Sequence, residues 1–370
     1  MANTAWAIVN FRLELIHALI DAKYELIVMA SNDGYETKIP EKVHFIPLKN
    51  LKPTGKNPWT DYRLISEIEH HLKSNRVDLL LTFTPKANIY GCLSARRAHT
   101  LCIPTVNGLG RVFNTESILK SIVLRLYKLA FNKLQIVIFQ NQDDADFFSQ
   151  KGIVSKDQIH RIAGSGVNLS IFQPKAEDEP AKDTIILTYA GRLLPEKGVF
   201  DYIKAVRRIA DRSNCKFQLV GRTANHRNTR IENEVSHLCQ QAKIEYLGST
   251  DRIAEYLRQV DVFVFPSYYR EGIPKVLLEA LATGLPIITT NSVGCKETVE
   301  HGKNGWLVPP MDHHALGDAI DQAIAASASS RKEFGQQSRK LAEMRFDVKD
   351  VVERYMHLSQ TILTDSNKKY

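Results

Sequence analysis

The 370 residues of this chain are enough for two domains with separate cores. The composition is that of an ordinary globular protein, with 44% hydrophobic and 24% charged residues, and we find neither a signal peptide nor an apolar run long enough to span a membrane. The net charge of +8 lies mainly in residues 1–170, and a positive charge suits an anionic partner. Because no nucleic-acid-binding signature accompanies it, we expect that partner to be a membrane or a substrate. Five cysteines without metal-type spacing indicate a reducing cytoplasm: Cys92, Cys102, Cys215, Cys239 and Cys295.

Residues 1–168 alternate helices with short apolar strands, a pattern typical of a parallel α/β sheet. We expect an opening loop, a helix (11–22) and two strands (25–30 and 43–48), followed by a helix (62–75) and a strand (77–84). A helix after residue 85 and a strand within 103–113 come next. A helix (118–131) then leads to a strand and a helix within 134–152. Gly108 and Gly110 follow the strand within 103–113, where they predict a turn.

The segment 118–131, ILKSIVLRLYKLAF, mixes apolar residues with Lys120, Arg125 and Lys128, and Lys133 follows it. A basic amphipathic helix of this kind is suited to an anionic lipid leaflet. A helix that packs in the core and keeps a solvated basic face explains the pattern equally well.

Asp144 and Asp146 form an Asp-x-Asp pair, a spacing that can place two carboxylates on a divalent metal ion. We interpret the pair as the acidic first turn of a helix, where carboxylates interact favourably with the helix dipole. We therefore expect no metal site there.

A polar, acidic stretch, AEDEPAKD at residues 176–183, separates the two halves and predicts a domain boundary. The alternation then restarts with strands (184–190, 217–220, 244–246) and helices (200–210, 230–242, 251–258), and it closes with helices near 315–326 and 347–363.

The stretch 260–310 carries the strongest signal in the chain. VDVFVFPS predicts a buried strand, YYREG a polar loop, Pro274 the start of a helix that Gly284 ends, and LPIITT the next strand. Ligands of parallel sheets bind beyond the carboxyl ends of strands, where helix N-termini offer N–H groups to anions. Glu271 lies in the predicted loop and Glu279 eight positions later in the predicted helix.

The second strong pattern is GRLLPEKG at residues 191–198, a polar loop after a buried strand, with Arg192 and Lys197 as its cations. Together with EGIPKVLLE, it resembles the retaining glycosyltransferases of family 4, and the resemblance extends over nearly the whole chain. It implies the GT-B architecture of two Rossmann-like, doubly wound α/β domains that face an interdomain cleft. We expect an acceptor-binding domain over 1–168 and a nucleotide-sugar-binding domain over 169–346, with a last helix at about 347–364 that returns to the first domain.

The resemblance also implies roles for the residues of the donor side. Arg192 and Lys197 would hold the diphosphate of a nucleotide-sugar, and Glu271 the sugar hydroxyls; these three are the expected catalytic residues. Glu279 would accept hydrogen bonds from the ribose. The amide groups at the helix start would assist the cations, so that no metal or other cofactor is required: Gly272, Ile273, Pro274 and Lys275.

The acceptor side is expected to be formed by segments of the first half that are similar to family segments: NFR at residues 10–12, TPKANIYG at 84–91 and NGLG at 107–110. The residues expected there are Arg12, Lys86, Asn88, Tyr90, Gly108 and Gly110.

We therefore expect an enzyme that moves a sugar from a UDP-sugar, with GalNAc, GlcNAc and Gal as the ranked candidates, to a lipid-diphosphate-linked saccharide in bacterial surface polysaccharide assembly. It would work on the cytoplasmic face of the membrane as a peripheral protein and would not bind nucleic acid. Two alternatives stay open. One is a nucleotide-sugar epimerase of the same architecture, and the other is a nucleotide-sugar-binding protein without turnover.

The start of the chain departs from the family pattern, in which a strand precedes the loop that Asn3, Thr4, Ala5 and Trp6 resemble. Only Met1 and Ala2 precede it here. We expect a truncated first strand, with about ten further residues upstream, and strands 25–30 and 78–84 without their shared neighbour.

Overall fold

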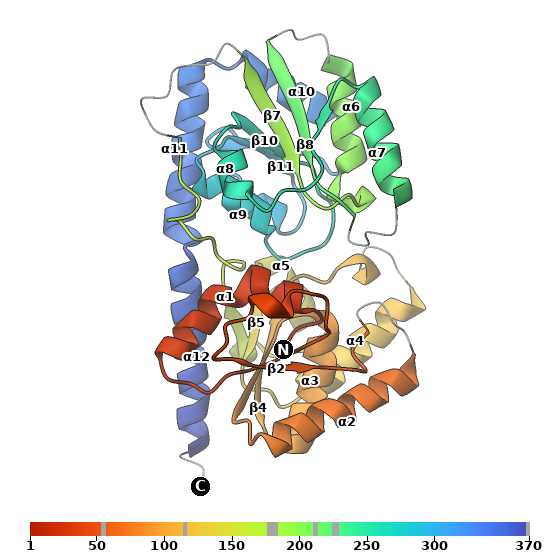
Figure 1. The fold of residues 1–370 in the computed structure, drawn as a ribbon, viewed down its shortest axis with the longest axis vertical. Helices are drawn as coiled ribbons and strands as arrows, with labels where there is room; N and C mark the ends of the chain where they lie inside the picture. The colour runs from red at the N-terminus through yellow and green to blue at the C-terminus, as the bar shows by residue number, and fades with distance from the viewer. Residues whose placement is uncertain (53–56, 114–116, 176–183, 210–213, 224–228, 368–370) are drawn as a thin grey trace. The chain divides into compact units, whose positions relative to one another are not determined.

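The computed structural model describes the chain except for residues 53–56, 114–116, 176–183, 210–213, 224–228 and 368–370. The predicted boundary at 176–183 therefore lies outside the described residues. The chain forms two compact units (Figure 1). Unit 1 consists of Met1–Ser165 and Val348–Tyr370, and unit 2 of Gly166–Asp347.

The described residues of unit 1 form two parallel sheets, of order β1-β2 and β3-β4-β5-β6. Their strands are β1 (Ile27–Ala30), β2 (His44–Pro47), β3 (Leu79–Thr82), β4 (Leu101–Val106), β5 (Val137–Phe139) and β6 (Ile159–Arg161). The helices are α1 (Ala5–Asp21), α2 (Pro58–Ser74), α3 (Pro85–Ala98), α4 (Ile118–Phe131), α5 (Gln142–Gln150) and α12 (Val348–Asn367).

The first residues of the chain lie between the two sheets of unit 1. The Ala2 amide donates to the carbonyl of Met29 (3.2 Å), which belongs to β1, and the Phe83 amide at the end of β3 donates to the carbonyl of Met1 (3.1 Å). Met1 and Ala2 are buried. The expectation that β1 and β3 lack a shared neighbour is therefore wrong, because the backbone of Met1–Ala2 connects them.

In unit 2, the part of the chain that the structure describes forms one parallel sheet of order β12-β11-β10-β7-β8-β9. The strands are β7 (Ile185–Ala190), β8 (Cys215–Val220), β9 (Glu245–Tyr246), β10 (Val262–Phe265), β11 (Ile287–Thr290) and β12 (Gly305–Val308). The helices are α6 (Val199–Ile209), α7 (Thr229–Gln241), α8 (Ile253–Leu257), α9 (Lys275–Ala282), α10 (His313–Ala325) and α11 (Ala328–Arg345).

The two central strands of unit 2, β7 and β10, have continuous apolar sequences because the sheet is covered on both faces there. All residues of β10 are buried, and five of the six residues of β7, IILTYA, are buried as well. Strands covered on both faces consist of continuous apolar runs, which is how these two appear in the sequence. The ring of Tyr189 in β7 stacks on that of Tyr202, with centroids 5.7 Å apart, and on that of Phe265 in β10, with centroids 5.8 Å apart.

Some elements differ from the sequence-based expectation. Helix α1 begins at Ala5 rather than at residue 11, because the Thr4 hydroxyl caps it by accepting from the Ala7 amide. Helix α11 was not predicted, since its buried residues are small and form no apolar stripe: Gly335, Ser338 and Ala342. Strand β6, IHR, was also missed because it contains a single apolar residue, and β12, GWLV, was missed as well. Among the described helices, none has the length and apolar character that crossing a membrane requires.

Candidate functional site

The residues of the predicted donor side gather at one edge of the unit 2 sheet. β7 and β10 are neighbouring parallel strands, so the loops that follow them leave from the same edge. The first loop carries Arg192 and Lys197, and the second carries Glu271. Helix α9 begins directly after the second loop, with Pro274 as its N-cap residue.

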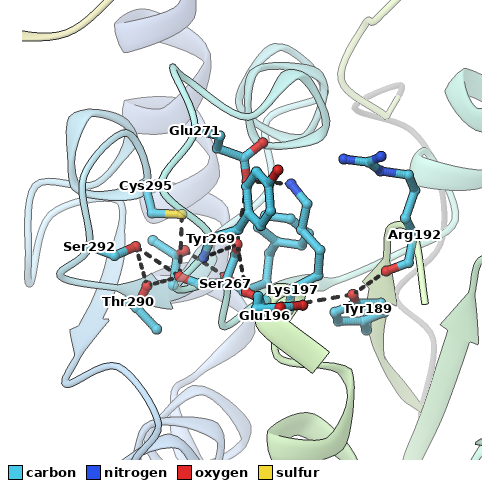
Figure 2. A network of polar contacts seen from close by, with 12 residues as sticks. Tyr189, Arg192, Glu196, Lys197, Ser267, Tyr269, Glu271, Thr290, Ser292 and Cys295 are labelled. Carbon is cyan, nitrogen blue, oxygen red and sulfur yellow. Dashed lines mark hydrogen bonds and ion pairs between the residues drawn. The ribbon is translucent and has the colours of Figure 1, made fainter. Parts of the chain in front are cut away.

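Lys197 and Glu271 form an ion pair between the Lys197 ammonium and Oε1 of Glu271, which Figure 2 shows at the centre of the site. The Lys197 side chain is 7% exposed and that of Glu271 19%. The rings of Phe265 and Tyr269 lie 5.4 and 5.2 Å from the Lys197 nitrogen. These aromatic faces and the carboxylate stabilise the buried ammonium.

Arg192 has different surroundings. Its side chain is exposed, and among the described residues its guanidinium makes no ion pair (Figure 2). Its backbone carbonyl accepts from the hydroxyl of Tyr189, which lies equally close, at 3.3 Å, to the carbonyl of Lys197. Tyr189 is buried, and burial raises the pKa of its phenol. The Tyr189 hydroxyl thus holds the backbone of the loop, while the Arg192 guanidinium stays in solvent.

Glu279 lies inside α9 and is almost completely buried. Burial raises the pKa of its carboxyl group from 4.5 to about 7, and the Lys275 ammonium, 3.9 Å from Oε1, opposes the shift. Gly272, Ile273 and Pro274 are buried just before the helix. The first N–H groups of any helix have no partner within it, so the start of α9 offers donors to an anion.

On the predicted acceptor side, Lys86 and Tyr90 contact a residue that the sequence did not single out. Asp61 of α2 accepts from the Lys86 ammonium (3.0 Å) and from the Tyr90 hydroxyl (2.7 Å). Burial and the Asp61 carboxylate raise the pKa of Tyr90. No local sequence signal joins Asp61 to α3, because the contact arises only from the packing of α2 on α3.

Two other predicted acceptor residues lie in the interior. Asn88 is buried and spans from the Thr82 hydroxyl to the Thr105 carbonyl, each at 2.8 Å. These two bonds hold the Asn88 side chain in the interior. Arg12 is buried beneath the rings of Phe83 (4.5 Å) and Tyr355.

Arg12 also donates to the side-chain oxygen of Asn107 (3.2 Å), the residue that begins the predicted glycine-rich loop. Gly108 and Gly110 in that loop have φ of +92° and +70°, so the predicted turn is confirmed. The interior position of Arg12 connects it to the loop rather than to the surface.

The prediction of an acidic first turn in α5 is confirmed for Asp144, whereas Asp146 lies beyond that turn. Asp143 and Asp144 lie in that turn, and the amide of Asp144 donates to the N-cap Asn141. Asp144 is buried, and its carboxylate accepts from the Asn141 amide group (3.0 Å). Nowhere in the described part of the chain do three or more His, Cys, Asp or Glu side chains form a group that could hold a metal ion.

The sequence analysis also missed a cluster of small polar residues behind Glu271. Ser267, Thr290, Ser292 and Cys295 bond to one another there (Figure 2). The positions of Ser267 shortly after β10 and of Thr290 and Ser292 at the end of β11 were an available signal, because binding residues of parallel sheets occupy such positions. Two cations, a carboxylate and a helix N-terminus therefore meet at one sheet edge, which suits a ligand that carries both phosphate and hydroxyl groups.

Comparison with protein families assigns both halves of the chain. Residues 8–170 match the family model "Glycosyltransferase Family 4", and residues 171–341 match "Glycosyl transferases group 1".

Three relatives match between 70% and 98% of the chain. It is 25% identical to a Campylobacter jejuni N,N'-diacetylbacillosaminyl-diphospho-undecaprenol alpha-1,3-N-acetylgalactosaminyltransferase over 98% of each chain. It is also 25% identical to a Staphylococcus aureus capsular polysaccharide biosynthesis glycosyltransferase, over 92% of this chain and 91% of the relative. A UDP-Gal:alpha-D-GlcNAc-diphosphoundecaprenol alpha-1,3-galactosyltransferase of Escherichia coli is 28% identical over 70% of each chain.

Solved structures share the fold. A sucrose-phosphate synthase of Thermosynechococcus elongatus superposes with a TM-score of 0.80 at 23% identity, covering 95% of this chain and 92% of its own. A Rickettsia africae glycosyltransferase gives 0.77 at 17% identity, with 96% and 95% covered. Both units have the parallel α/β architecture of the GT-B fold. The chain therefore belongs to the glycosyl transferases of group 1, with a first half of the family 4 type, and is an enzyme that transfers sugars.

Proposed function

We propose that this enzyme moves a sugar from a UDP-sugar to a lipid-diphosphate-linked saccharide, with retention of the anomeric configuration, during assembly of a bacterial surface polysaccharide. GalNAc is the first candidate for the sugar, followed by GlcNAc and Gal. The observation that carries the proposal is the pairing of Lys197 with Glu271 at the sheet edge where α9 begins.

The donor side is supported by charge and by the position of the loops. Glycosyl transfer releases a nucleotide diphosphate that gains negative charge in the transition state. Cations held beside the leaving group stabilise that state more than the ground state. In this proposal Arg192 contacts phosphate oxygens through its planar guanidinium, and Lys197 acts as a point charge. Glu271 then accepts from hydroxyls of the sugar, and Glu279 from those of the ribose.

The acceptor side is supported by relatives and by unit 1. The Campylobacter relative is named for transfer to an undecaprenol-diphosphate saccharide, and the Escherichia relative for transfer to GlcNAc-diphosphoundecaprenol. The Lys86–Tyr90–Asp61 group of unit 1 offers a cation and a hydroxyl to such an acceptor. A lipid-linked acceptor implies that the enzyme works as a peripheral protein at the membrane surface.

The test is a transfer assay with radiolabelled UDP-GalNAc, UDP-GlcNAc or UDP-Gal, in the presence and absence of an undecaprenyl-diphosphate saccharide. We expect label in the lipid fraction with one of these donors, and NMR of the product should show the anomeric configuration of the donor. We also expect turnover to continue in excess chelator, since the cations and the α9 N-terminus carry the leaving diphosphate.

Three results would contradict the proposal, each in a different way. Conversion of the free donor without acceptor identifies an epimerase. Tight UDP binding without turnover on any acceptor identifies a binding protein. A complete loss in chelator that Mg²⁺ reverses would require a metal and would return attention to Asp144 and Asp146.

A further inference from the structure

The loop that carries Glu271 is held near its start by side chains from the end of β11 and the segment after it. The peptide carbonyl of Ser267 accepts from the hydroxyls of Thr290 and Ser292 (2.8 Å for Ser292) and lies 3.7 Å from the thiol of Cys295. Figure 2 shows these groups converging on one oxygen. The start of the loop is therefore fixed.

The same segment also fixes the end of the loop. Gly294 has φ of +85°, and a Cβ atom there would lie 1.6 Å from the carbonyl oxygen of Gly272 and 2.8 Å from that of Glu271. Only glycine allows the two backbones to approach so closely. The loop backbone is thus hydrogen-bonded at Ser267 and closely packed at Glu271 and Gly272, whereas the Glu271 side chain depends on other groups.

The Ser267 hydroxyl is the neutral group that reaches this side chain. It lies 3.3 Å from Oε1 of Glu271 and 3.3 Å from the carbonyl of Glu196, and it accepts from the Tyr269 amide. A hydroxyl has a single proton, so it serves one of the two oxygens at a time. Ser267 is fully buried, so no water takes over either bond.

Lys197 and Ser267 bond to the same oxygen of Glu271. Among the described residues, Oε2 of Glu271 makes no hydrogen bond, and in the proposed function it is the oxygen that accepts from the sugar. On the proposed function, a donor diphosphate draws the Lys197 ammonium toward its own oxygens. Oε1 then loses its cation, and the carboxylate would rotate unless another donor held it.

We propose that Ser267 is a positioning residue for Glu271: its hydroxyl takes over Oε1 when Lys197 turns to the diphosphate, so that Oε2 stays aimed at the sugar. This inference rests on the proposed function and deepens it. Ser267 touches neither substrate, and its effect passes entirely through Glu271.

The test compares Ser267→Ala with wild-type enzyme, using UDP-GalNAc and the lipid-linked acceptor for turnover and UDP and UDP-GalNAc for calorimetry. We expect kcat to fall about tenfold or more, since a hydrogen bond to a charged group is lost. UDP affinity should change by less than about twofold, because UDP lacks the sugar. Ser267→Thr keeps the hydroxyl and should recover most of kcat.

Ser338→Ala is the matched control. Ser338 is also fully buried in unit 2, and its hydroxyl donates to the Leu285 carbonyl at 2.7 Å, apart from Glu271. It should lower the melting temperature without lowering kcat. In a Glu271→Gln background, Ser267→Ala should lose its effect on UDP-GalNAc affinity, which a purely structural role would not predict.

Wild-type kcat in Ser267→Ala overturns the inference alone, and so does an equal loss of affinity for UDP and UDP-GalNAc. If Ser267→Ala does not fold, the comparison of Ser267→Thr with Ser267→Val, which differ in the hydroxyl and not in shape, decides the same question. A wild-type enzyme that uses none of UDP-GalNAc, UDP-GlcNAc and UDP-Gal overturns the proposed function, and the inference with it.

Discussion

Arg192 and Lys197 share one expected role but occupy different surroundings. Lys197 is buried between two aromatic rings and paired with Glu271, whereas the Arg192 side chain is exposed. Removal of Lys197 would leave the largely buried Glu271 carboxylate without its cation, which costs folding stability as well as activity. Arg192 therefore gives the cleaner test of diphosphate binding.

We expect Arg192→Ala to lower kcat about 100-fold, the usual loss when one charge-stabilising donor is removed from a transition state. The melting temperature should stay unchanged, because the side chain makes no ion pair with the described residues. Arg258, exposed at the end of α8, provides the control: Arg258→Ala should leave kcat unchanged. Equal kcat values for both variants would remove Arg192 from the donor site.

The raised pKa of Glu279 predicts that both folding stability and UDP affinity depend on pH. Its carboxyl has a raised pKa of about 7, so the folded protein holds this proton while the unfolded chain, near 4.5, releases it. Its contribution to stability is complete below pH 4.5 and is lost as the pH rises through 7. A ribose diol needs the ionised acceptor, so UDP affinity should rise with pH over the same range.

The measurement is UDP titration by calorimetry from pH 5.5 to 8.5, with Glu279→Gln as the comparison. The wild-type dissociation constant should fall up to about tenfold per pH unit below 7 and then level off. The Gln variant should keep only the weaker pH dependence that the terminal phosphate of UDP, with a pKa of about 6, contributes by itself. Parallel profiles for the two proteins would mean that Glu279 does not contact the nucleotide.

At the scale of elements, α4 combines the two alternatives that its sequence left open. Tyr127, Ala130 and Phe131 are buried, so this part of the helix packs in the core. Ile118 is 82% exposed, and Ile122 and Leu129 are also exposed. The helix thus presents apolar side chains to solvent beside its basic residues, which is the composition that favours an anionic lipid surface.

We expect the enzyme to sediment with vesicles that contain anionic lipid, and added salt should weaken the binding. Replacing Arg125 and Lys128 with Gln, or Ile118 and Ile122 with Ser, should each reduce the bound fraction. All four side chains are exposed, so the melting temperature should not change. Exchanging exposed Lys332 and Lys340 of α11 for Gln is the control. Binding that all variants retain would leave α4 as an ordinary packed helix.

At the scale of the whole molecule, unit 1 is built from both ends of the chain. Helix α12 contributes Tyr355, Leu358 and Ile362 to a core that also holds Ile8 of α1 and Phe83 after β3. The Tyr355 hydroxyl bonds to that of Thr105 at 2.9 Å, and its ring meets Phe83 edge-on. Unit 1 therefore cannot be complete without the last helix.

We expect Tyr355→Ala to lower the free energy of unfolding by about 3–5 kcal/mol, the usual cost of an aromatic side chain removed from a core. Tyr355→Phe keeps the ring and loses one hydrogen bond, at a cost of about 1 kcal/mol. Urea unfolding followed by circular dichroism measures both. Similar losses for the two variants would show that the ring does not anchor α12.

Local patterns predicted most elements, and the reason is visible in particular strands. β7 and β10 are continuous apolar runs bounded by polar loops, so the sequence marked them within a few residues. Helix α11 was not predicted because it buries small side chains. Helix α1 begins six residues before its predicted start because the Thr4 side chain caps it. Such features depend on neighbours in space rather than on periodicity.

The sequence by itself determined the alternation of strands and helices, the division into two halves and the identity of the charged residues in the donor loops. Only the tertiary structure decided which residues from distant parts of the sequence meet. Lys197 pairs with Glu271 from 74 positions away, Asp61 with Lys86 and Tyr90 across α2 and α3, and Tyr355 with Thr105 across 250 positions. These contacts follow from the strand order β11-β10-β7 and from helix packing. A local pattern reports how a segment buries its own side chains and contains no record of which segment lies beside it.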